Sequence, residues 1–219
     1  MTSRSSARLY WNRLYRRSGY VYGTRPSQYL CAQQFRLHPG MTALLLGDGE
    51  ARNGVWMASL GLDVVSIDWS SAAIAKGRRL AKDARVSLTF CCHNLLTWNW
   101  PQEQFDAAVA IHCHLTPANL RPVARRITAC LKPGGVFILE GFHCSHGNGT
   151  ATERFYTAAL VKEYFPNLEI IEFREELDIL DEGPMHQGPA NLVRFTGRKP
   201  QPTALARANQ SESLFEGNI

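Results

Sequence analysis

The sequence has no apolar run that approaches the roughly 20 residues needed to cross a bilayer. We therefore expect no membrane-spanning segment and no membrane partner. Its six cysteines show no Cys-x-x-Cys spacing, and no signal peptide precedes them. Reduced thiols in a cytoplasmic protein are the expectation.

Acidic residues are missing from the first 47 positions, which carry seven arginines. Two functions fit such a segment: an Arg-rich transit peptide, or an anion-attracting flap beside a binding site. Six tyrosine and tryptophan residues in the same segment favour packing, and so the flap. They are Tyr10, Trp11, Tyr15, Tyr20, Tyr22 and Tyr29. No groove-reading motif accompanies the charge, so nucleic acid is disfavoured as a partner.

A strand, a tight turn and a helix are predicted in close succession at residues 43–58. The apolar run 43–46 stops at Gly47-Asp48-Gly49, and helical periodicity resumes soon after. Because Gly47 and Gly49 lack a Cβ, the backbone there can come close to a ligand. The N–H groups that open the following helix remain able to donate to that ligand. The pattern predicts a small-molecule site at this turn.

An acidic residue at the end of the next predicted strand complements the turn. The run at residues 63–67 ends in Asp68, 19 residues after Gly49. In doubly wound sheets an acid at this position accepts hydrogen bonds from both hydroxyls of a ribose. The sequence therefore predicts an adenosine-containing cofactor. A surface Asp that starts a turn before a helix capped by Ser70 or Ser71 is the alternative.

Strand and helix alternate through most of the chain. The strands predicted after Asp68 cover residues 86–91, 105–111, 136–140, 168–177 and 190–198. A helix is predicted at residues 152–164, and a Gly/Pro-rich link at residues 181–189. This order predicts an α/β fold, a Rossmann-like three-layer α/β/α sandwich whose seven-stranded, mostly parallel sheet ends in an antiparallel hairpin.

Three segments are expected along the chain. Residues 1–40 would form a helical cap over the site, residues 41–198 the core, and residues 199–219 a flexible tail with little periodicity.

A series of short motifs follows this order. They are Tyr20-Val21-Tyr22-Gly23, residues 47–53, Asp68-Trp69-Ser70, Asn94-Leu95, residues 111–115, Leu131-Lys132-Pro133-Gly134-Gly135, residues 139–142, and Asp181-Glu182-Gly183 with His186-Gln187-Gly188. Together they resemble the class I S-adenosylmethionine-dependent methyltransferases, in particular the small bacterial branch similar to tellurite-resistance and thiopurine methyltransferases. The resemblance covers residues 8–198. Each motif is weak alone, and the ordered combination is specific.

The resemblance implies S-adenosylmethionine as the cofactor and assigns it a binding site. Gly47 and Gly49 would lie against the methionine moiety, and Asp68 would hold the ribose hydroxyls. The family often has an acid two positions before the first glycine, where this chain has Leu45. The cofactor's amino group would then depend on Asp48, Glu50 or backbone carbonyls. Ala51 replaces a third glycine, a mild change.

The same resemblance assigns the adenine side of the site. Trp69 would flank the adenine, while Asn94 and Leu95 would contact its edge and face. Ile111, at the end of the fourth strand, would lie beside the cofactor, and Tyr22 would help to cover it.

Three histidine and cysteine clusters stand at the ends of the third, fourth and fifth predicted strands. They are Cys91-Cys92-His93, His112-Cys113-His114 and His143-Cys144-Ser145-His146. Ligands bind at such strand ends, so these side chains could bind a soft metal or act as acid or base. Alternatively, the cysteines fill the core and the histidines form hydrogen bonds at strand ends. Alternation sends neighbours to opposite faces, so no metal is predicted, and His114 and His186 are the catalytic candidates.

The expected function is transfer of a methyl group to a small acceptor: a thiol, a thiopurine-like molecule, or a chalcogen or metalloid species. Methyl transfer from a sulfonium requires mainly alignment and desolvation. A nicotinamide-dependent oxidoreductase shares the glycine turn, but the missing third glycine and the late strand pair disfavour it. A non-catalytic cofactor-binding regulator is the second alternative, because Leu45 removes an acidic partner of the cofactor.

Overall fold

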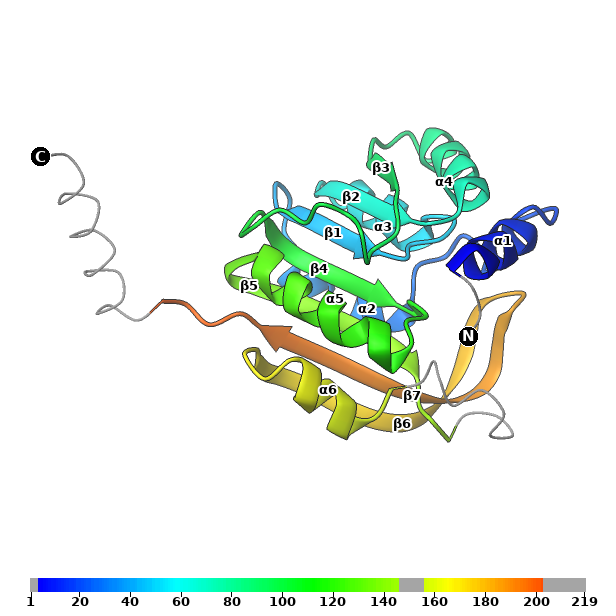
Figure 1. Cartoon of the computed structure of the whole chain (residues 1–219). Helices are drawn as coiled ribbons and strands as arrows, with labels where there is room; N and C mark the ends of the chain where they lie inside the picture. The colour runs from blue at the N-terminus through cyan, green and yellow to red at the C-terminus, as the bar shows by residue number, and fades with distance from the viewer. Residues whose placement is uncertain (1–3, 146–155, 203–219) are drawn as a thin grey trace, which may run out of the picture.

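The computed structural model describes residues 4–145 and 156–202 (Figure 1). His146 and residues 203–219 of the predicted tail therefore lie outside the described part. The elements are α1 (Arg4–Tyr15), α2 (Gln28–Ala32), the 3-10 helix η1 (Gln34–Arg36), β1 (Thr42–Leu46), α3 (Arg52–Ser59), β2 (Asp63–Asp68), α4 (Ser71–Asp83), β3 (Thr89–Cys92), β4 (Phe105–Ile111), α5 (Pro117–Cys130), β5 (Leu131–Phe142), α6 (Ala158–Tyr164), β6 (Glu169–Gly183) and β7 (His186–Arg198).

A seven-stranded sheet in the order β3-β2-β1-β4-β5-β7-β6 forms the centre of the molecule. Strands β1 to β5 run parallel, and β7 lies antiparallel between β5 and β6. The predicted mostly parallel sheet with a C-terminal antiparallel hairpin is confirmed. The strand order reverses between β1 and β4, and ligands of open α/β sheets bind in the crevice at such a switch point.

Helices cover both faces of the sheet, and the side chains of β1 show why. Leu44 and Leu46 pack in the cluster that includes residues of α5 and α6. Ala43 and Leu45 point the other way, into the cluster that includes residues of α2 and α3. A central strand buried on both faces is expected to be apolar on both, and the four buried residues 43–46 of β1 all are. The three-layer arrangement follows, and it confirms the predicted fold class.

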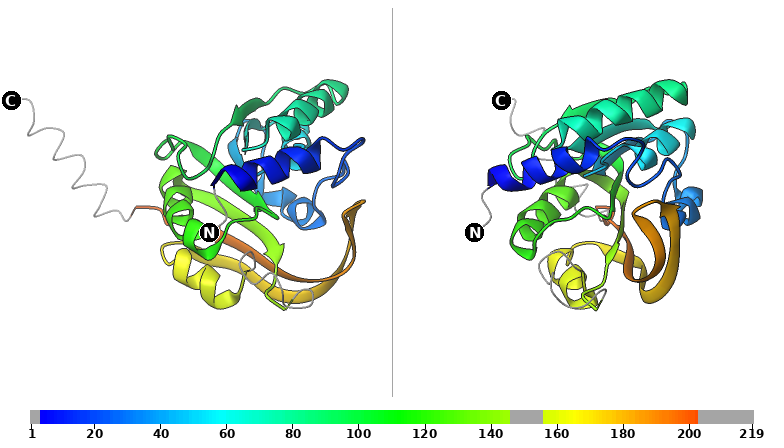
Figure 2. Two further views of the ribbon diagram at one scale, coloured as in Figure 1. Left: turned by 45° about the vertical axis from the view of Figure 1, so that its right-hand side comes forward. Right: turned by 90° about the vertical axis from the view of Figure 1, so that its right-hand side faces the viewer.

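Strands β6 and β7 extend beyond the sheet as a curved two-stranded ribbon (Figure 2). The link predicted at residues 181–189 is wrong, because strand pairing continues to the His186–Gly183 pair. The ribbon packs against the N-terminal segment: a Cβ at Gly183 would lie 2.3 Å from the backbone of Tyr22. Glycine and proline content marks a loop in the sequence but cannot reveal this tertiary support.

Two other predicted boundaries shift. The third strand, predicted from residue 86, begins at Thr89, and the helix predicted from residue 152 begins at Ala158 among the described residues. Within the described part of the chain, no helix combines the length and apolar content needed to cross a bilayer.

Helix α1 and the segment after it dock on α4 (Figure 1). Asn12 Oδ1 accepts hydrogen bonds from Ser70 Oγ at 3.0 Å and from the backbone N–H of Ala72 at 3.2 Å. The amide of α1 thereby satisfies a backbone donor in the first turn of α4, which a helix cannot satisfy itself. Ser70 is the N-cap of α4, as predicted from the sequence.

Candidate functional site

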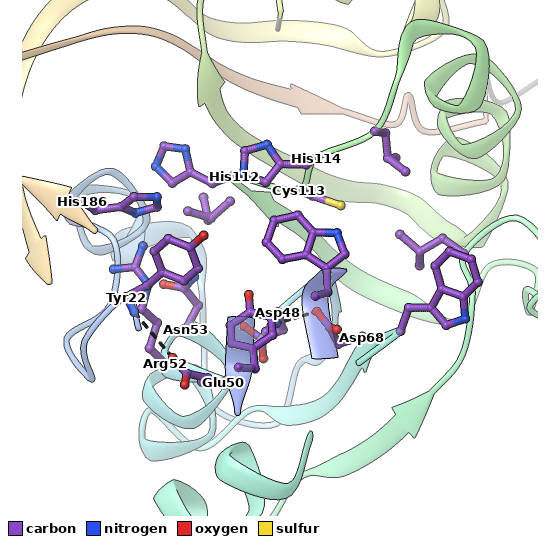
Figure 3. Close-up of a pocket in the computed structure, with 18 of the residues that line it drawn as sticks. Tyr22, Asp48, Glu50, Arg52, Asn53, Asp68, His112, Cys113, His114 and His186 are labelled. Atoms are coloured by element: carbon purple, nitrogen blue, oxygen red, sulfur yellow. Dashed lines mark hydrogen bonds between the residues drawn. The ribbon is translucent and has the colours of Figure 1, made fainter. Parts of the chain in front are cut away.

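One pocket at the switch point brings the predicted site residues together (Figure 3). All nine predicted cofactor-binding residues line it: Tyr22, Gly47, Asp48, Gly49, Asp68, Trp69, Asn94, Leu95 and Ile111. Both catalytic candidates, His114 and His186, line the same pocket. Residues that are far apart in the sequence therefore line one pocket. The role of each residue stays a prediction.

The glycine turn after β1 has no room for a side chain at Gly47 or Gly49. Gly47 and Gly49 both have a φ of 60°, in the left-handed region that favours glycine. A Cβ at Gly47 would lie 2.8 Å from Cys113 Sγ, and one at Gly49 would lie 2.6 Å from Tyr15 Oη. The turn thus offers bare backbone to the pocket, and α1 packs directly on it through Tyr15.

Asp68, at the end of β2, points into the hollow beside this turn. Its Oδ2 accepts the backbone N–H of Gly49 at 2.9 Å, and its Oδ1 accepts that of Ser70 at 2.7 Å. Burial raises the pKa of Asp68 to about 6, although these backbone hydrogen bonds act in the opposite direction. Each carboxylate oxygen has two lone pairs, so each can accept a further hydrogen bond from a ligand hydroxyl.

The two other acids of the turn are directed into the protein. Asp48 Oδ2 accepts from Ser66 Oγ at 2.8 Å, and burial raises the pKa of Asp48 to about 7. The Glu50 carboxylate accepts from Lys76 Nζ and from the backbone N–H of Val21, both at 2.7 Å. The Glu50 carboxylate therefore serves the protein's own structure. Asp48 lines the pocket, and its Oδ1 is buried without a hydrogen-bond partner among the described residues, so Asp48 and the backbone carbonyls remain the groups for a cofactor amino group.

The adenine side of the predicted site is formed by the ends of β2, β3 and β4. Trp69 is half-buried, while Leu95 and Ile111 are buried and offer apolar surface. Asn94 Oδ1 accepts the backbone N–H of Leu96 at 3.0 Å and so holds the turn after β3 in shape. This side of the pocket suits a flat apolar ring with a polar edge.

Histidines gather on the side of the pocket away from Asp68 (Figure 3). The rings of His112 and His186 have centroids 4.4 Å apart, and the ring of His186 lies 4.5 Å from that of Tyr22. His114 stacks on Trp11 of α1 at 5.4 Å. Burial, reinforced by His186, lowers the pKa of His112 well below its usual value, so its imidazole is neutral at pH 7.

A buried ion pair connects the β6–β7 ribbon to this end of the pocket. Arg52 Nη2 lies 2.6 Å from Glu182 Oε2, and the side chains are 7% and 1% exposed. Glu182 Oε1 also accepts the backbone N–H of Gln28 at 3.1 Å. Burial acts to raise the pKa of Glu182, but the contact with His186 and the charge of Arg52 lower it to about 2.

Sequence reasoning considered His112 only as a member of a histidine and cysteine cluster, and it assigned no role to Arg52 or Glu182. His112 had a usable signal, since it follows directly on the strand that ends at the switch point. Arg52 and Glu182 stand 130 positions apart, and no local pattern relates them.

The three histidine and cysteine clusters converge only in part. His93, His112 and His114 line the pocket. His143 instead lies 3.7 Å from Glu175. Burial raises the pKa of the Cys113 thiol to about 12, so this cysteine is an inert structural side chain.

Comparison with known proteins agrees with the geometry. Residues 43–135 match the model of the methyltransferase domain family. Over 114 residues the chain is 28% identical to an uncharacterized methyltransferase of Synechocystis sp., and the match covers 51% of each protein. The chain thus spans about half the length of this curated relative.

Solved structures share the fold at low identity. A structure from a study of the conversion of a disulfide bond into a thioacetal group during echinomycin biosynthesis has a TM-score of 0.75 and 16% identity, covering 97% of this chain and 100% of that one. TehB from Haemophilus influenzae has a TM-score of 0.65 and 18% identity, covering 88% and 66%. Phosphoethanolamine N-methyltransferase 2 of Haemonchus contortus, in complex with S-adenosyl-L-methionine, has a TM-score of 0.64 and 16% identity, covering 88% and 57%.

Proposed function

Since this chain contains a class I S-adenosylmethionine-dependent methyltransferase domain, we propose that it transfers a methyl group from S-adenosylmethionine to a small acceptor. The observation that carries the proposal is the placement of Asp68 beside the bare turn at Gly47 and Gly49, where its Oδ2 accepts the Gly49 N–H. A nucleoside sugar and a sulfonium can then occupy neighbouring positions in one pocket. The nicotinamide-dependent alternative does not fit a methyltransferase domain.

The cofactor spans the ends of β1, β2 and β4 in this proposal. Asp68 holds the two ribose hydroxyls, and the backbone at Gly47 and Gly49 lies against the methionine moiety. Trp69, Asn94, Leu95 and Ile111 surround the adenine; as a group they combine apolar surface with one polar edge. Tyr22 covers the cofactor from the N-terminal segment.

The acceptor occupies the histidine end of the pocket, beside His114 and His186. Residues 1–40 act as a cap there, because Trp11 stacks on His114 and Tyr22 contacts His186. The cap and the β6–β7 ribbon restrict the acceptor to a small molecule. We favour a thiol, a thiopurine-like molecule or a chalcogen species, whose soft nucleophilic atom attacks the methyl group of a sulfonium without strong activation.

Methyl transfer from a sulfonium requires the side chains mainly to align the reactants. In-line displacement needs the nucleophile, the methyl carbon and the sulfur in a row, and water kept away from the charged centre. Trp11, Tyr15 and Tyr22 exclude water over the turn. His186 and His114 orient the acceptor and can take up its proton if it arrives protonated.

Two measurements on the purified full chain test the proposal. Titration calorimetry with S-adenosylhomocysteine, the demethylated product, should show saturable binding at one site. A screen of 2-mercaptoethanol, 6-mercaptopurine, selenite and tellurite should then show demethylated cofactor accumulating with at least one acceptor. Lack of saturable binding would refute the cofactor site. Binding without turnover across these thiols and oxyanions would instead favour a non-catalytic cofactor-binding protein.

A further inference from the structure

Three buried side chains that can ligate a metal converge at the histidine end of the pocket. One ligand atom from each of His112, Glu182 and His186 lies within 4.8 Å of the other two. They come from separate places in the fold, the end of β4 and the two sides of the β6–β7 turn. We propose that these three residues bind a divalent transition-metal ion of the zinc class. The argument for this site does not rest on the proposed methyl transfer, although the two share His186.

Three of the four histidine ring nitrogens in this cluster lack hydrogen-bond partners among the described residues. Both nitrogens of His112 and Nδ1 of His186 are buried and have no hydrogen bond among the described residues. Their nearest carboxylate oxygens, on Glu140 and Glu182, are 3.5 and 3.7 Å away. The two histidine side chains are only 5% and 6% exposed. A buried polar atom without a partner is costly, and a bound cation would satisfy these nitrogens.

The chemistry of the three groups matches a known ligand set. Two imidazoles and one carboxylate bind zinc in catalytic sites and Fe(II) in the facial-triad sites, and both leave a coordination position open. The neutral imidazole is the form that ligates metals. Each oxygen of the Glu182 carboxylate keeps a lone pair beyond its contacts with Arg52 and Gln28.

The backbone at His112 adds a second, independent sign of a built site. Its φ of 49° lies in the left-handed region, which residues other than glycine rarely adopt. The neighbouring strand holds this conformation, because the His112 N–H donates to the Glu140 carbonyl at 2.7 Å. Strained residues of this kind cluster at ligand sites. Here the unusual turn places the imidazole against that of His186.

Charges around the cluster set the expected strength of binding. Arg52, paired with Glu182 at 2.6 Å, repels a divalent ion. Glu140 lies on the other side of His112 and attracts it, but its own partner Arg194, at 2.7 Å, offsets that charge. We therefore expect weaker binding than at a structural zinc site. An ion held here would keep its open position toward the acceptor end of the pocket.

Cobalt(II) and zinc(II) titrations of the full chain test this site. After treatment with a chelator and its removal, one equivalent of cobalt should produce visible d–d absorption, and zinc should displace it. His112→Asn and His186→Asn should each weaken binding about tenfold or more, the scale reported even for second-shell losses. His143→Asn is the matched control, because this histidine lies outside the pocket, and it should bind cobalt like the wild type.

Calorimetry with S-adenosylhomocysteine in the chelator-treated protein shows whether each variant is folded and has an intact cofactor site. This result does not depend on metal binding. A wild-type chain that binds neither cobalt nor zinc would overturn the metal site, whatever the cofactor result. Unchanged cobalt binding in both pocket variants would also overturn it. If one histidine variant fails to fold, the other histidine variant carries the comparison.

Discussion

Replacement of Asp68 by Asn tests the proposed cofactor site at its centre. The wild-type carboxylate accepts two backbone N–H groups, at 2.9 and 2.7 Å, and in our proposal also accepts both ribose hydroxyls. Asn keeps the shape but turns one oxygen into a donor. That donor must face a backbone N–H or a ribose hydroxyl. The variant therefore loses at least one hydrogen bond to a charged group, about 1.5 to 3 kcal/mol, or about 10- to 150-fold in affinity.

The pH dependence of cofactor affinity is a second test of the role of Asp68. The pKa of Asp68 in the free protein is about 6, so the group is mostly ionised at pH 7 and mostly protonated at pH 5. A protonated carboxyl loses acceptor capacity. Affinity should therefore fall about tenfold between pH 7 and pH 5, because only about a tenth of the carboxyl is then ionised. The Asn variant, which cannot titrate, should show little of this fall.

Titration calorimetry with S-adenosylhomocysteine at pH 5, 6, 7 and 8 measures both effects, with circular dichroism confirming the folded state at each pH. Asp63→Asn is the control, because Asp63 is an exposed residue at the other end of the same strand. The reasoning is refuted if Asp68→Asn binds as tightly as the wild type at pH 7. It is also refuted if the variant keeps the full loss of affinity at low pH.

Three further changes probe the structure around the site. Glu50→Gln leaves buried Lys76 without its ion-pair partner and should lower the free energy of unfolding in urea by about 3 to 5 kcal/mol; a loss below about 1 would contradict the proposed anchoring. Gly49→Ala places a Cβ 2.6 Å from a tyrosine hydroxyl and should weaken S-adenosylhomocysteine binding in calorimetry, whereas Gly19→Ala, with a similar φ of 68° and open space around it, should not. Asp48, with a pKa of about 7, binds a proton in the native state that the unfolded chain has released above about pH 4. Stability should therefore fall as pH rises from 4 to 7, by up to about 4 kcal/mol from this group, and the urea midpoint of Asp48→Asn should change less between pH 5 and 8.

The parts of the site that could be predicted from the sequence are those set by local spacing. Gly47 and Gly49 follow the apolar run at residues 43–46, and Asp68 ends the next strand. In a parallel sheet, neighbouring strands end at the same edge. Their meeting in one pocket therefore follows from the order of strands alone, and the β1–β2 register joins Leu46 to Ile67.

The acceptor end depends on contacts between distant segments, which spacing cannot supply. Glu182 meets Arg52, the first residue of α3 and a residue of the pocket wall, because the β6–β7 ribbon curves back over this part of the molecule. In the sequence, the same stretch has the glycines and proline of a loop. The unusual backbone of His112 is equally invisible, because a histidine carries no sequence signal for a positive φ. These features depend on tertiary packing, which overrides local propensity.

The hydrogen bonds of Asn12 have a consequence for the rate of product release in the proposed methyl transfer. One amide oxygen on α1 completes the first turn of α4, which begins three residues after Asp68. In the proposed methyl transfer, a movement of α1 that released the demethylated cofactor would therefore also loosen α4. Product departure and fraying of α4 would then be one event, and we expect product release, more than the displacement itself, to limit turnover.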